Sequence, residues 1–125
     1  MRKVIIGILM SFCLFGVYQS LWANHSMHPL KQIAFVKKMI ERQQEPYRTA
    51  YVQLIRYADS IQHVTHHARN NFAVPGYYVK PEEHRANSLA LQQDAFAAYC
   101  SALAYRLSGK KGYGEKACYF RFSTV

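Results

Sequence analysis

The sequence predicts an all-α protein built from antiparallel helical hairpins. Apolar residues recur at spacings of three and four along most of the chain after residue 28, which is the period of amphipathic helices. A strand-like alternation of polar and apolar residues is missing from the sequence. Half of the 125 residues are hydrophobic and only 18% are charged, a composition that excludes a disordered chain and fits at most one domain.

The first 23 residues have the layout of a secretory signal peptide. Arg2 and Lys3 give a short cationic start, Val4 to Tyr18 carry no charge, and Ala23 is a small residue suited to precede a cleaved bond. The alternative is an uncleaved membrane anchor, because the uncharged run through Ala23 has 20 residues. We expect residues 1–23 to be removed and the protein to be periplasmic or secreted.

Charge narrows the choice of partners for residues 24–125. Lys and Arg outnumber Asp and Glu by 16 to 7 in the whole chain, and removal of residues 1–23 leaves a formal charge of +7. A positive charge of this size favours anionic partners, and export makes nucleic acid an improbable one. We expect an acidic polymer as partner, and contact with a membrane only through the signal segment before cleavage.

Four helices are expected in the remaining chain. They are predicted over residues 30–40, 46–61, 85–108 and 113–119. Pro46 suits a first helical turn, and Gly109 suits a helix C-terminus. Between residues 62 and 83 the periodicity disappears, so a long ordered loop is expected there.

This loop and the start of the next helix hold the candidate binding residues, which are aromatic or cationic: Tyr77, Tyr78, Lys80, His84 and Arg85. Aromatic faces can stack on sugar rings, and Lys or Arg can pair with carboxylates. The alternative is that the tyrosines pin the loop to the helices while the cations are only solvated.

Cysteines and histidines give two further interpretations. Cys100 and Cys118 are about equally far from a turn near Lys110, so they could form a disulfide in an oxidising compartment. Alternatively, Cys100 is a small core residue. His63 and His67 would share a helical face, with His66 beside them, but no nearby Cys or acid completes a zinc site, so no metal or cofactor is expected.

Several segments together resemble the alginate-lyase-type polysaccharide lyases. Residues 94–117 are similar to that family's helix–turn–helix signature. Residues 28–29 and 44–47 resemble its opening hairpin, and residues 74–78 with 84–85 resemble its next loop. The resemblance covers nearly all of the chain from His28 to Cys118.

The resemblance implies an exported (α/α) toroid that cleaves uronic-acid polymers by β-elimination. In that family the catalytic Asn, His, Arg and Tyr lie on helices further along the chain, so the catalytic residues of this protein are unknown and expected downstream. We therefore expect residues 24–125 to be a truncated, N-terminal part of such a toroid that is inactive by itself. The alternative function is that of a small non-catalytic periplasmic helical protein that binds a polyanion or a protein partner.

Overall fold

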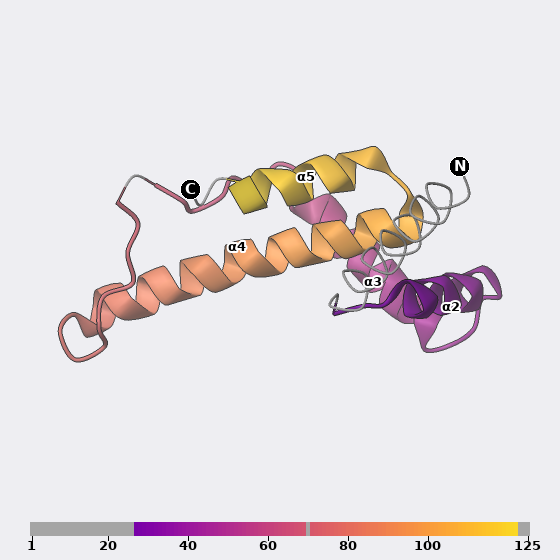
Figure 1. Ribbon diagram of the computed structural model, residues 1–125, viewed down its shortest axis with the longest axis horizontal. Coiled ribbons are helices and arrows are strands. Elements are labelled where there is room, and N and C mark those ends of the chain that lie inside the picture. The colour runs from indigo at the N-terminus through magenta and orange to yellow at the C-terminus, as the bar shows by residue number, and fades with distance from the viewer. Residues whose placement is uncertain (1–26, 70, 123–125) are drawn as a thin grey trace, which may run out of the picture.

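The computed structural model describes residues 27–69 and 71–122, and the predicted signal peptide, residues 1–23, lies outside them. The described residues form only α-helices and no β-strand, so the all-α prediction is confirmed. The helices are α2 (Leu30–Glu41), α3 (Tyr47–Ser60), α4 (Pro81–Ser108) and α5 (Lys111–Phe122), as Figure 1 shows.

The longest helix, α4, organises the molecule. Helix α5 runs back antiparallel along the C-terminal half of α4 (Figure 1), and these two helices pair most extensively. The turn between them is made by Gly109, whose φ of 75° places it in the left-handed region and whose N–H donates to the carbonyl oxygen of Tyr105 at 2.8 Å. This is the predicted glycine cap.

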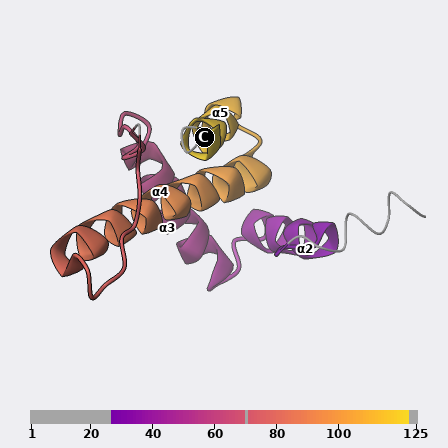
Figure 2. The same cartoon turned by 60° about the vertical axis from the view of Figure 1, so that its left-hand side comes forward.

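Helices α2 and α3 complete the arrangement. Helix α3 crosses α4, and α2 lies at the opposite end of the molecule from the start of α4, as both Figure 1 and Figure 2 show. Residues 61–69 and 71–80, called the connector below, lie between α3 and α4 and run past α5. The expected long loop is therefore present.

Small residues bring α3, α4 and α5 close together. Buried hydrophobic residues form two clusters among these helices, composed of Ala58, Ala104 and Tyr113, and of Ile61, Ala97 and Phe120. Because Ala58 and Ala104 have no exposed surface and little bulk, the helix backbones can approach closely. The core of the described chain is consequently compact but small.

Two helices begin earlier than the sequence predicts. Helix α4 starts at Pro81 rather than near Arg85, because proline suits a first turn and Glu82 and Glu83 are favourable near a helix N-terminus. Helix α5 starts at Lys111 rather than Tyr113.

Several large apolar and aromatic side chains of α4 are only partly covered. They are 38% to 55% exposed and comprise Leu89, Leu91, Phe96, Tyr99 and Tyr105. The inner face of α4 instead carries small and polar side chains, which are Asn87, Asp94, Ala97, Cys100, Ser101 and Ala104. No helix of the described chain is both long and apolar enough to span a membrane.

The expected Cys100–Cys118 disulfide is not formed in the structure. Both cysteines are free thiols, and Cys100 is buried whereas Cys118 is exposed. The two residues lie on antiparallel helices as predicted, but equal distance from the turn does not place them on facing sides. Burial raises the pKa of the Cys100 thiol, which favours its unreactive protonated form.

Candidate functional site

The connector delivers the predicted binding residues to the N-terminal end of α4. Tyr77, Tyr78 and Lys80 lie at the end of the connector, and His84 and Arg85 lie in the first two turns of α4. A turn shapes this end, because the N–H groups of Val79 and Lys80 donate to the carbonyl oxygen of Gly76 at 3.0 and 3.2 Å. We call these five predicted residues the Tyr77 cluster.

Tyr77 is the centre of the Tyr77 cluster. Its ring meets the rings of Tyr78 and His84 edge to face, with centroids 5.5 and 5.6 Å apart. The Nη2 group of Arg85 donates to the Tyr77 hydroxyl at 3.1 Å, and the same guanidinium lies 5.6 Å from the Tyr77 ring centroid. The structure therefore brings Tyr77, Tyr78, His84 and Arg85 together.

The two tyrosines differ in exposure. Tyr77 is 44% exposed and takes part in all the contacts just described, so it does help to hold the loop. Tyr78 is 98% exposed and contacts the rest of the Tyr77 cluster through Tyr77. The interpretation that the tyrosines pin the loop therefore fits Tyr77 but not Tyr78, whose ring face is open to a ligand.

Glutamates accompany the cations of the Tyr77 cluster. Lys80 Nζ lies 3.0 Å from Glu83 Oε2, and Arg85 Nη1 lies 3.4 Å from Glu82 Oε1. All four side chains are at least 46% exposed. Exposed pairs of this kind contribute little stability, about 0–1 kcal/mol, so a ligand carboxylate can replace the glutamate at small cost.

Hydrogen bonds to α4 hold the part of the connector that precedes Tyr77 in the sequence. His84 Nδ1–H donates to the carbonyl oxygen of Pro75 at 2.7 Å. Asn87, which is buried, donates to the carbonyl oxygen of Ala73 at 2.6 Å and accepts from Arg69 Nη2 at 3.2 Å. The backbone that presents Tyr77 and Tyr78 is thus anchored at two levels of α4.

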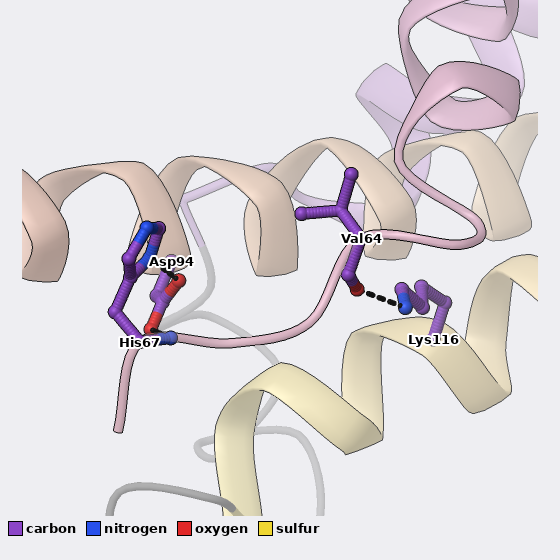
Figure 3. A network of polar contacts seen from close by, with 4 residues as sticks. All are labelled: Val64, His67, Asp94 and Lys116. Carbon is purple, nitrogen blue, oxygen red and sulfur yellow. Dashed lines mark hydrogen bonds and ion pairs between the residues drawn. The ribbon is translucent and has the colours of Figure 1, made fainter. Parts of the chain in front are cut away.

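The beginning of the connector is held from two helices (Figure 3). Asp94 of α4 accepts from the backbone N–H of His67 at 2.8 Å and from its Nδ1–H at 2.7 Å. Lys116 of α5 donates through Nζ to the carbonyl oxygen of Val64 at 2.6 Å. The ring of His66 packs on the ring of Tyr119, with centroids 4.9 Å apart.

Two histidines of the connector contact the helices. His67 donates to the carboxylate of Asp94, and the His66 ring packs on Tyr119 while its Nδ1 atom is buried without a hydrogen-bond partner. Across residues 27–69 and 71–122, no three or more His, Cys, Asp or Glu side chains gather in a way that could hold a metal ion.

Sequence reasoning missed Asn87 and Asp94. A signal was present, because Asn87, Asp94 and Ser101 are spaced by seven residues, and positions seven apart lie on one helix face. All three side chains are buried on α4. Polar residues at that spacing on one face of a predicted helix indicate that this face contacts polar groups as well as apolar ones.

An apolar pocket lies away from the Tyr77 cluster, among α2, α3 and α4. Its volume is about 240 Å³, and it is lined by His28, Gln32, Ile33, Val36, Ile40, Tyr47, Ala50, Tyr51, Leu54, Leu103 and Leu107. The pocket follows from the light packing of α2 on the other helices. Its lining supplies few polar groups, whereas the Tyr77 cluster combines an open ring face with cations.

The arrangement of the Tyr77 cluster suits binding of a planar or ring-shaped anionic ligand. A guanidinium next to an exposed aromatic ring can pair with a carboxylate while the ring contacts apolar C–H groups. Compared with protein-family models, with curated proteins and with solved structures, the chain matches none of them.

Proposed function

We propose that this chain binds an acidic polysaccharide of the alginate type through the Tyr77 cluster. The observation that carries the proposal is the nearly complete exposure of the Tyr78 ring beside a guanidinium, that of Arg85, held on Tyr77. The formal charge of +7 on residues 24–125 supports attraction of a polyanion over longer distances.

Each part of the Tyr77 cluster has a role in this proposal. Tyr78 stacks on the apolar face of a pyranose ring. Arg85 exchanges its exposed contact with Glu82 for a uronate carboxylate, and Lys80 exchanges its contact with Glu83 in the same way. Because carboxylate ligands replace carboxylate side chains, the exchange conserves the type of hydrogen bond and costs little.

The wider proposal follows the resemblance to the alginate-lyase-type family. We propose that the chain is the N-terminal part of an exported lyase with an (α/α) toroid, and that the Tyr77 cluster guides the polymer towards catalytic residues on later helices. β-Elimination needs neutralisation of the uronate carboxylate, a base for the C5 proton and an acid for the leaving oxygen. No residue of this chain is assigned the base or acid role, and the chain alone is expected to lack lyase activity.

Exposed apolar side chains on α4 support the toroid part of the proposal. In repeat architectures each helical hairpin buries its apolar face against a neighbouring hairpin. Leu89 and Phe96 are more than half exposed, as expected for a hairpin that needs such a neighbour. The alternative, a non-catalytic periplasmic binding protein, would use the same Tyr77 cluster but would not need a neighbour.

The binding proposal is tested with Tyr78→Ala and Arg85→Met. Calorimetry with alginate oligosaccharides is expected to show about a fivefold rise in Kd for Tyr78→Ala, because an aromatic contact contributes about 1 kcal/mol. Arg85→Met is expected to weaken binding about tenfold through loss of a charge-assisted hydrogen bond.

Arg106→Met is the matched control, because Arg106 is an exposed arginine near the other end of α4. The substitution removes the same charge from the same helix and is expected to change Kd less than twofold. Equal weakening by Arg85→Met and Arg106→Met would show that net charge alone attracts the polymer, and the proposed site would be wrong.

A further inference from the structure

The connector is fixed by buried polar side chains of α4 in a region where the other inner residues of the helix are small. Asp94 is 5% exposed and Asn87 is 6% exposed, whereas Ala97 and Ala104 occupy comparable inner positions. A buried carboxylate destabilises a protein unless partners compensate for its lost hydration. The partners of Asp94 therefore explain its place in the core.

Those partners both belong to the connector. The carboxylate of Asp94 accepts through Oδ2 from the backbone N–H of His67 and through Oδ1 from its Nδ1–H (Figure 3). The two bonds fix the position of the His67 backbone as well as its ring. Asp94 thereby sets where the connector crosses α4. Asn87 fixes a second part of the connector, closer to the tyrosines, through its hydrogen bonds with Arg69 and Ala73.

We propose that Asp94 is a positioning residue for the Tyr77 cluster. By holding His67, its carboxylate orients the connector, and the bonds of Asn87 to Ala73 and of His84 to Pro75 carry that position on to Tyr77 and Tyr78. The relevance of this role for polysaccharide binding rests on the proposed function. The position of the connector itself can be measured without any ligand.

The test uses Asp94→Asn in the full chain, with backbone NMR order parameters of residues 71–79 and alginate-oligosaccharide Kd as measurements. Asparagine keeps the shape and one acceptor but cannot form an ion pair. The order parameters are expected to fall from about 0.85 towards 0.6, and the Kd is expected to rise about threefold or more.

His67→Ala is the second variant, because it removes the same contact from the exposed connector without changing the inner face of α4. His63→Ala, a change at another exposed histidine of the connector, is the control and is expected to change neither measurement. If Asp94→Asn fails to fold, the order parameters and Kd of His67→Ala test the positioning role in its place.

The outcomes separate the two proposals. Unchanged order parameters in Asp94→Asn and His67→Ala would overturn the positioning role. Lower order parameters with unchanged Kd, where Tyr78→Ala does weaken binding, would overturn it as well. If Tyr78→Ala leaves Kd unchanged, the binding proposal fails, and the order parameters alone decide whether Asp94 positions the Tyr77 cluster.

Discussion

Tyr113 connects α5 to α3 through a short hydrogen bond to a carboxylate. Its hydroxyl donates to Asp59 Oδ1 at 2.6 Å, and the side chain is buried. The hydrogen bond to Asp59, followed by burial and by the negative charge of Asp59 and of ionised Tyr51, raises the pKa of Tyr113 to about 12. Ionisation of this phenol would remove the donor and place two negative charges together.

Tyr113→Phe is expected to lower the free energy of unfolding by about 1.5–3 kcal/mol at neutral pH, because a buried hydrogen bond to a charged group is lost. A raised phenol pKa stabilises the fold fully below the ordinary value of 10, and this contribution is lost as the pH rises to about 12. Denaturant unfolding across this pH range is expected to show the wild-type stability falling towards that of Tyr113→Phe. The control is Tyr78→Phe, at an exposed site, and a Tyr113→Phe protein as stable as that control would contradict the prediction.

Some residues of the candidate site could be predicted from the sequence, and the roles of others could not. The Tyr77 cluster was predictable, because aromatic and cationic residues lie close together around a Pro-Gly turn. The roles of Asn87 and Asp94 were not, because their partners are 27 residues away for Asp94 and 14 or 18 for Asn87. Local periodicity contains no information about which distant segment will supply a donor.

The helices themselves were largely predictable, and the faces that they bury were not. All four helices were expected, since apolar spacing, Pro46 and Gly109 are local signals. The periodicity did not show that the buried face of α4 carries Asn87, Asp94, Ser101 and small residues, whereas Leu89 and Phe96 are more than half exposed. Helices α4 and α5 pack closely, because a Cβ atom added at Gly114 would lie 3.2 Å from the Tyr105 ring.

The close approach of α4 and α5 predicts opposite outcomes for two neighbouring glycines. An added Cβ at Gly112 meets nothing within 4 Å, so Gly112→Ala is expected to stabilise the protein by up to about 1 kcal/mol through helix propensity. Gly114→Ala gains the same propensity but must displace Tyr105, so it is expected to be about 1 kcal/mol less stable than Gly112→Ala. Thermal unfolding of both variants measures the difference, and equal stabilities would show that α4 and α5 are not tightly packed at Tyr105.

At the scale of the whole molecule, a small core coexists with extensive exposed apolar surface. Half of the buried hydrophobic residues of the described chain are Ala or Cys, whereas Leu30, Phe35, Leu89 and Phe96 are each at least half exposed. The pocket among α2, α3 and α4 adds to this surface. Apolar surface of this kind marks an interface or an unstable isolated domain.

The proposed origin as part of a toroid predicts weak cooperativity for the isolated chain. The protein is expected to bind a hydrophobic dye and to melt over a broad temperature range, because its helices lack neighbours that would cover them. Leu103→Asn, within the pocket, is expected to lower dye fluorescence more than Leu89→Asn, outside it. A sharp, reversible melt with little dye binding would instead favour the small periplasmic binding protein.

The connector has a consequence for the order in which the protein matures. Val64 is held by Lys116, 52 residues later, and His67 is held by Asp94, 27 residues later. A segment fixed by helices that follow it cannot take its final position while the chain is still being synthesised, because its partners have not yet been made. The Tyr77 cluster, which is held by His84 and Asn87 of α4, is therefore expected to form only after α4 has been made, so the proposed binding surface would be absent from a partly synthesised chain.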